Sequence, residues 1–299
     1  MFTIRQIFVG RVGVRAGWSA LLYALIYAGM VGVSLLALRW WAPGIDRLLH
    51  DQFLSKVTLL LTVLHVLTVA LVLIATLVMA KIERRSVWSY GLTGTRSLGN
   101  FTKGLVAGLA LLSLVIALLF FSGNFVFDGR ALGGAAIFGY GSFWAVNFFL
   151  IGLFEETLFR GYPLQTLSRG IGFWPAAILL SVVFGLSHIN NDGETAAGII
   201  QVVLAGMILC LGRKLTGSLW WSIGFHAAWD WAQSFLYGTA DSGIVAQGHL
   251  LSSHAAGDVH FSGGVAGPEG SPACIAVLLV TLAIMFVMAK RQSVPADAA

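Results

Sequence analysis

Eight long apolar stretches constrain the fold of this chain more than any other feature of its sequence. A helix needs about 20 largely apolar residues to cross the roughly 30 Å hydrocarbon core of a bilayer. Of the 299 residues, 58% are hydrophobic and only 10% are charged, which excludes a water-soluble monomer. We therefore expect an all-α, polytopic membrane protein with about eight transmembrane helices. They lie at about residues 18–38, 57–80, 104–122, 142–167, 174–191, 195–212, 217–237 and 272–289.

The basic residues predict the orientation, because cytoplasmic loops are enriched in Lys and Arg. Of the 18 Lys and Arg residues, all but Arg39, Arg47, Lys56 and Arg130 fall at the two ends of the chain or in the second, fourth and sixth connections. We therefore expect both termini in the cytoplasm and a multi-pass protein of the cell membrane. The basic residues do not gather on one surface, so the net charge of +5 does not indicate nucleic-acid binding.

The N-terminal residues point to a membrane span that is kept. Arg5, Arg11 and Arg15 lie among apolar residues, and the long apolar run that follows has no small-residue cleavage site. We interpret this run as a retained first span and not as a cleaved signal peptide. In the third span, Gly104 and Gly108 form a GxxxG pattern, which permits close contact with another helix.

We divide the chain into three parts. Residues 1–141 hold the first three spans, with a connection at 81–103 whose basic and aromatic residues suit the membrane surface. Residues 142–237 hold the next four spans, which carry the ionisable residues described below. Residues 238–299 hold a loop and the last span.

The loop at Gly238–Ser271 has no Lys or Arg and is rich in Gly, Ser and Ala, which predicts a mobile, non-cytoplasmic segment. Its three histidines, His249, His254 and His260, have no regular spacing. We interpret them as ordinary loop residues and not as metal ligands.

Three groups of ionisable residues lie inside predicted spans, where each charge costs on the order of 2.5–3.5 kcal/mol. In the first group, Glu156 and Arg160 are four residues apart on one helical face and can form an ion pair. Glu155 points away from that face and has no dedicated cation, so it is a candidate general base. The alternative is a helix that ends at Phe154 and leaves these charges in water.

The other two groups contain histidines. His188 lies near the end of the fifth span, and a lone histidine is more often a packed residue than a catalyst. His226 and Asp230 share a helical face in the seventh span, where a structural hydrogen bond between helices is the alternative. A helix rises 1.5 Å per residue, which gives the depth of each side chain in the membrane. His188, His226 and Asp230 lie at the same depth as Glu155 only if the buried part of the fourth span begins near Asn147.

Together these residues form a recognisable pattern on neighbouring membrane helices. It resembles the CPBP family of intramembrane proteases, also called the CAAX protease and bacteriocin-processing family or Abi family. Each motif alone is weak, but three in this order and spacing are specific, and they cover about residues 142–237. The motifs are EExxxR at Glu155, Glu156 and Arg160, FxxxH at Phe184 and His188, and HxxxD at His226 and Asp230.

The resemblance implies a catalytic role for four residues in a cavity within the helix bundle. Glu155 and His188 would activate a water, while His226 and Asp230 would orient and stabilise the developing oxyanion. The family often has Asn where this chain has Asp230, and an ionised Asp only accepts hydrogen bonds. Asp230 would then fix the His226 ring and leave His226 to face the oxyanion.

The resemblance also implies supporting residues, a cofactor and a substrate class. Glu156 and Arg160 would form a supporting ion pair, with Phe184 beside them. The substrate would be a membrane-embedded or lipid-anchored peptide or protein, and membrane lipids would be the other partner. Whether that substrate is prenylated stays open.

Two questions remain open at the level of sequence. Zinc or another divalent metal could bind Glu155, His188 and His226, although no HExxH motif is present, and Glu and His could instead act on water without a metal. The function could also be that of a proton- or ion-coupled transporter, or of a non-catalytic membrane immunity or interaction protein on the same fold.

Overall fold

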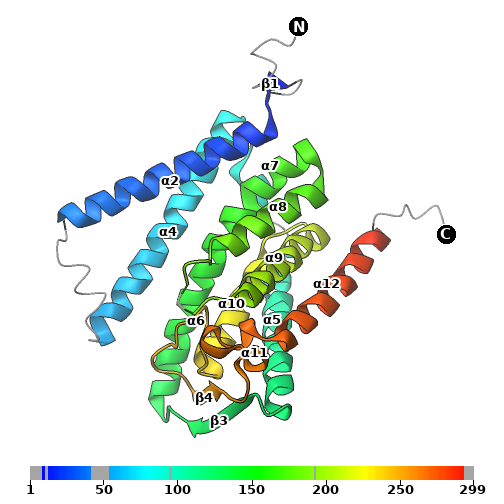
Figure 1. Cartoon of the computed structure of the whole chain (residues 1–299). Coiled ribbons are helices and arrows are strands. Elements are labelled where there is room, and N and C mark those ends of the chain that lie inside the picture. Colours follow the sequence, from blue (N-terminus) through cyan, green and yellow to red (C-terminus); the bar gives the residue numbers. More distant parts are fainter. Residues whose placement is uncertain (1–8, 11–12, 42–53, 94–95, 192, 293–299) are drawn as a thin grey trace.

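The computed structural model describes residues 9–10, 13–41, 54–93, 96–191 and 193–292 (Figure 1). The basic residues Arg5, Arg11 and Arg47, which entered the predicted orientation, lie outside the described residues. Within the described ranges the protein is almost entirely helical, so the predicted all-α, polytopic class is confirmed.

Helices occupy all eight predicted stretches, and six of them are long and apolar enough to cross a membrane. The fourth begins at Ala135, earlier than predicted, and runs without a break to Ile171 because its last part continues through a π-helix. The six are α2 (Ala16–Trp41), α4 (Leu54–Ile82), α5 (Ser97–Phe121), α6 (Ala135–Glu156) with η2 (Thr157–Gly161) and α7 (Tyr162–Ile171), α9 (Ala196–Thr216) and α12 (Pro272–Gln292).

The other two predicted spans are shorter than expected. Helix α8 (Phe173–Leu186) has 14 residues, or about 21 Å of rise, because the chain turns at Ser187, whose hydroxyl donates to the carbonyl oxygen of Phe184. Helix α10 (Trp220–Trp231) has 12 residues and continues as the π-helix η3 (Ala232–Leu236). Neither is long enough by itself to cross a full hydrocarbon core.

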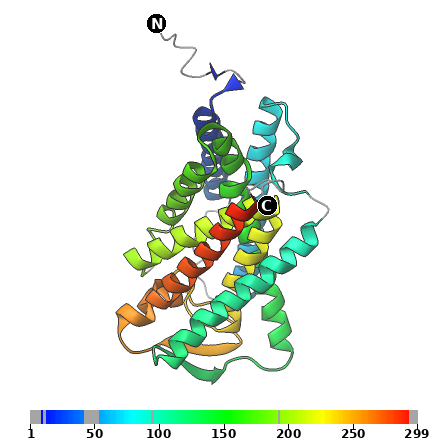
Figure 2. The same cartoon turned by 90° about the vertical axis from the view of Figure 1, so that its right-hand side faces the viewer.

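The helices form a bundle with α10 near its centre (Figure 1). Helix α10 packs between α5 and α6, and α9 packs between α8 and α12. Figure 2 shows α12 lying along one face of the bundle beside α5 and α9. Helices α2 and α4 lie on the other side, against α7 and α6 respectively.

The segment between α10 and α12 is not the irregular loop that we expected. Its strand β4 (Leu251–Ala255) pairs antiparallel with β3 (Phe125–Arg130), the strand that follows α5. It then forms three short helices, and several of its small residues are buried at the end of the bundle. These helices are α11 (Val259–Ser262), η4 (Gly264–Ala266) and η5 (Pro268–Gly270).

Two smaller elements complete the described fold. Strands β1 (Val9–Gly10) and β2 (Gly13–Val14) pair before α2. The helix η1 (Val87–Tyr90) lies in the connection between α4 and α5 and is tied to α10, because the indole of Trp220 donates to the carbonyl oxygen of Leu92.

Glycines bring α5 and α10 into direct backbone contact. A Cβ on Gly104 would overlap the carbonyl oxygen of Trp221, and a Cβ on Gly108 would overlap that of Phe225. The contact is reciprocal, since a Cβ on Gly224 would overlap the carbonyl oxygen of Phe101. The close contact that the GxxxG pattern predicted is therefore present, and it fixes the helix that carries His226.

We expect Gly108→Ala to lower the stability of the protein by roughly 1–3 kcal/mol, because the methyl group forces the backbones of α5 and α10 apart. Thermal unfolding of the purified protein in detergent measures the change. Gly99→Ala is the matched control, since a Cβ on Gly99 in the same helix meets nothing within 4 Å. Equal unfolding temperatures for the two variants would contradict the role given to this contact.

Candidate active site

A cavity of about 150 Å³ lies inside the bundle, between α6, α8, α9, α10 and the segment that follows α10. The predicted catalytic residues all line it. They are Glu155 on α6, His188 just after α8, and His226 and Asp230 on α10. The convergence that the sequence analysis required is present, and the alternative of a helix ending at Phe154 is wrong because α6 continues through Glu156 into η2.

The predicted ion pair of Glu156 and Arg160 is completely buried beside the cavity. Nη1 of Arg160 lies 3.0 Å from Oε1 of Glu156, and neither side chain is exposed. Arg160 was counted above among the cytoplasmic loop residues, and that assignment is wrong because its side chain is inside the bundle. The same carboxylate oxygen of Glu156 lies 3.1 Å from Nδ1 of His226. A chain of contacts therefore runs from Arg160 through Glu156 to the His226 ring.

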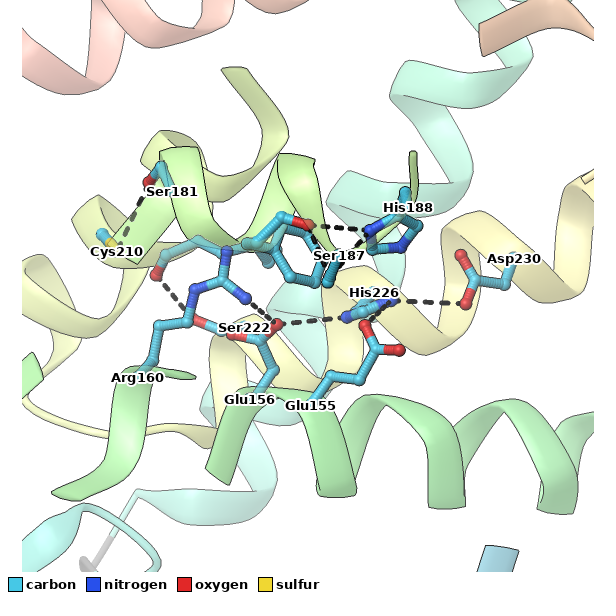
Figure 3. A network of polar contacts seen from close by, with 12 residues as sticks. Glu155, Glu156, Arg160, Ser181, Ser187, His188, Cys210, Ser222, His226 and Asp230 are labelled. Atoms are coloured by element: carbon cyan, nitrogen blue, oxygen red, sulfur yellow. Dashed lines mark hydrogen bonds and ion pairs between the residues drawn. The ribbon is translucent and has the colours of Figure 1, made fainter. Parts of the chain in front are cut away.

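The His226 ring is held by carboxylates on both of its nitrogens (Figure 3). Its Nε2 lies 3.4 Å from Oδ2 of Asp230 and 3.7 Å from Oε2 of Glu155. A protonated imidazole has an N–H donor on each nitrogen, so it satisfies carboxylates on both sides. Asp230 and Glu156 therefore contact the His226 ring from opposite sides, and the contact with Glu156 was not anticipated by the sequence analysis.

Glu155 presents its carboxylate to the cavity. Its Oε2 atom is shielded from solvent, lies 3.7 Å from Nε2 of His226 and accepts no hydrogen bond from the described residues. The side chain as a whole is 21% exposed and lines the cavity, so a water molecule can reach the carboxylate. This is the environment that a general base requires.

The hydrogen bonds around His188 define which ring nitrogen faces the cavity. Its Nδ1 lies 2.8 Å from the carbonyl oxygen of Phe184. Because a carbonyl oxygen only accepts, Nδ1 carries the proton, and in the neutral ring Nε2 is the atom with a free lone pair. The hydroxyl of Ser187, 3.2 Å from Nδ1, donates to the same carbonyl. Ser187 thus helps to fix the ring.

Phe184 packs at the centre of the polar network. Its ring centroid lies 4.2 Å from the guanidinium carbon of Arg160, which is a cation–π contact. The ring also packs edge-on against two histidine rings. Its centroid lies 4.9 Å from that of His188 and 6.2 Å from that of His226. Arg160 leaves Nε and Nη2 without a hydrogen-bond partner among the described residues, and the face of Phe184 partly compensates for this.

Both π-helices begin next to site residues. Helix η2 begins directly after Glu156, and η3 begins at Ala232, two residues after Asp230. A π turn inserts one extra residue and rotates the side chains that follow it, and such turns are frequent at functional sites. No residue pattern in the sequence predicted either π-helix.

The segment after α10 contributes three cavity residues that the sequence analysis missed, namely Asp241, Ser242 and Glu269. Glu269 accepts hydrogen bonds from the indole of Trp229 (3.1 Å) and from the backbone N–H of Ser242 (3.4 Å). Burial raises the pKa of both Asp241 and Glu269, and the neighbouring carboxylates raise the pKa of Asp241 further. The sequence analysis missed these residues because they lie outside the three motifs.

The predicted metal ligands do not form a metal site in this arrangement. Within the described ranges, no three His, Cys, Asp or Glu side chains are placed to hold a metal ion together. His226 instead turns Nδ1 toward Glu156 and Nε2 toward Asp230. Glu155, His188 and His226 therefore do not fit zinc as they stand, and the chemistry below is derived without it.

Residues 137–232, roughly a third of the chain, match the model of the Rce1-like family, described as type II CAAX prenyl endopeptidase Rce1-like. Over this segment the chain is therefore similar to the CAAX protease family. Together with the six long apolar helices, the match supports an integral membrane protein. The match contains all of the motif residues and ends before Asp241 and Glu269. Comparisons with curated proteins and with solved structures gave no match.

We expect Arg160→Met to destabilise the protein by about 3–5 kcal/mol, because it leaves the carboxylate of Glu156 buried without a cation. Replacing both partners, in Glu156→Leu with Arg160→Met, is expected to recover part of that loss. Arg169→Met is the control, since the Arg169–Glu83 pair is partly exposed and is expected to contribute less than about 1 kcal/mol. Thermal unfolding in detergent measures all three, and a double variant no more stable than the single one would contradict this account.

Proposed function

We propose that this protein is an intramembrane endopeptidase that hydrolyses a peptide bond of a membrane-embedded or lipid-anchored substrate. The observation that carries the proposal is the shared cavity. In it, the carboxylate of Glu155, which accepts no hydrogen bond at Oε2 from the described residues, and His188, with an available Nε2, meet the doubly held His226. The similarity to the Rce1-like family supports the reaction class, and the arrangement of the side chains supports their individual roles.

In the proposed mechanism, a water molecule in the cavity is activated by Glu155 and His188. Glu155 accepts a proton from the water, and the oxygen attacks the carbonyl carbon of the scissile bond. Negative charge then develops on the carbonyl oxygen. The N–H at Nε2 of His226 is the donor that stabilises this charge, with the ring held by Glu156 and Asp230. The proton on Glu155 passes to the leaving amine as the peptide bond breaks.

The cavity is suited to this chemistry because it lies within the bundle. A volume of about 150 Å³ accommodates several water molecules. Apolar residues form much of its wall, including Phe148, Ile151 and Leu209. In such surroundings a donor aimed at a developing charge stabilises it more strongly than the same donor does in water.

We expect Glu155→Gln and His188→Ala each to lower the rate of peptide cleavage by about 10²–10⁴-fold, since the first removes the group that accepts and passes on the proton and the second removes a ring that helps to activate the water. A library of quenched membrane peptides, incubated with the purified protein in detergent, measures the rate. Both variants should unfold at temperatures close to that of the parent. His254→Ala is the control, because His254 pairs with Asp128 on the exposed β3–β4 sheet, away from the cavity.

Cleavage that is undiminished in Glu155→Gln and His188→Ala would overturn the proposal. A parent protein that cuts no peptide, but moves protons or ions across vesicles, would favour the transporter alternative. A parent protein with neither activity would leave a membrane immunity or interaction protein on the same fold.

Metal dependence is tested separately. We expect cleavage to continue after dialysis against a chelator, because the donors are not arranged around a common point. Elemental analysis of the dialysed protein, followed by the cleavage assay with and without added zinc, gives the measurement. Activity that disappears on chelation and returns with zinc would show that Glu155, His188 and His226 rearrange around a metal.

A further inference from the structure

The wall of the cavity formed by α9 and the segment after α10 presents hydrogen-bond acceptors. We call Gln201, Asp241 and Glu269 the acceptor wall. All three residues line the cavity, and no Lys or Arg is among the described residues that line it. A second, smaller cavity shares Gln201 and Glu269 with the first and continues toward Glu194. The acceptor wall thus borders the space that Glu155 and His188 also face.

One atom of the wall, the amide oxygen of Gln201, lacks a hydrogen-bond partner among the described residues. Gln201 is only 2% exposed, yet its Oε1 atom accepts no hydrogen bond from the described residues. Buried amide oxygens are nearly always paired, because an unpaired one loses its hydration without compensation. Gln201 borders both cavities, so a donor placed in that space can reach it.

The two carboxylates of the wall lack a cation. Asp241 accepts from the hydroxyl of Ser234 at 2.9 Å, and Glu269 accepts from Trp229 and from the backbone of Ser242. These donors are neutral, and in the described part of the chain no Lys or Arg forms an ion pair with either carboxylate. Burial without a counter-charge favours the protonated form of a carboxyl group, and a cation in the cavity would stabilise the charged form instead.

We propose that the acceptor wall binds an N–H-bearing cation of the substrate, the side chain of a lysine or arginine near the scissile bond, and thereby selects which peptides are cut. Lysine brings three donors and arginine five, and neither brings an acceptor, which matches a wall of acceptors. The inference rests on the proposed function and adds a substrate class to it. Both carboxylates belong to the segment beyond residue 232, outside the family match.

The first experiment compares peptides that differ in one side chain. N-terminally blocked, quenched membrane peptides carry lysine or its uncharged analogue norleucine at successive positions around the cleavage site. We expect lysine at one position to raise kcat/KM by about tenfold or more, as one charge-assisted hydrogen bond would. An unblocked norleucine peptide tests whether the terminal amine can supply the cation instead.

The variants assign the preference to the wall. Asp241→Asn and Glu269→Gln keep an oxygen for Ser234 and for Trp229, so both retain hydrogen bonds of the parent. We expect each to reduce the lysine-to-norleucine ratio toward one. Asp258→Asn is the matched control, because Asp258 is an exposed carboxylate of the same segment and does not line the cavity; it should keep the parent ratio.

A second measurement does not depend on cleavage. In a non-ionic detergent, n-octylammonium should raise the unfolding temperature of the full chain more than n-octanol does, and this difference should vanish in Asp241→Asn. Peptide cleavage without any lysine preference, together with equal effects of the two octyl probes, overturns the inference and leaves the proposed function intact. Selective stabilisation by octylammonium with no cleavage of any peptide overturns the proposed function and supports the cation site.

Discussion

The buried contact chain from Arg160 through Glu156 to His226 is the interaction on which the site depends. Removing charges from water costs several kcal/mol per ion, and only close, well-directed contacts offset that cost. The Arg160–Glu156 pair has no exposure, and Phe184 covers the guanidinium. The pair therefore has one well-defined geometry, and that geometry points Oε1 of Glu156 at Nδ1 of His226. The orientation of the proposed oxyanion donor follows from a charge pair one helix away.

The surrounding helices hold this geometry by close packing. His226 lies on α10, whose backbone touches that of α5 at Gly104, Gly108 and Gly224. On its other side, α10 packs against α6, the helix of Glu155 and Glu156. Because protein interiors have few voids, a shift of α10 by a fraction of an ångström would have to displace its neighbours. The glycine contact and the ion pair together position the site from opposite sides.

The segment after α10 forms part of the cavity wall and adds polar residues to it. The family match ends at residue 232, whereas Asp241, Ser242 and Glu269 lie beyond it. The motif residues therefore supply the proposed chemistry, and a segment outside the match supplies the two carboxylates of the acceptor wall. Such a division allows substrate preference to change without altering the residues that act on water.

The sequence by itself determined the class of fold and the identity of the motif residues. Long apolar runs predicted a bundle of membrane helices, and Glu156 and Arg160, four residues apart, share a face once that segment is helical. The tertiary structure decided what spacing along one helix does not encode. It placed Glu156 against His226 across two helices, inserted the two π turns, shortened α8 and α10, and turned a Gly- and Ser-rich stretch into a wall of the cavity. These features arise from packing between segments distant in sequence, and no local residue pattern specifies them.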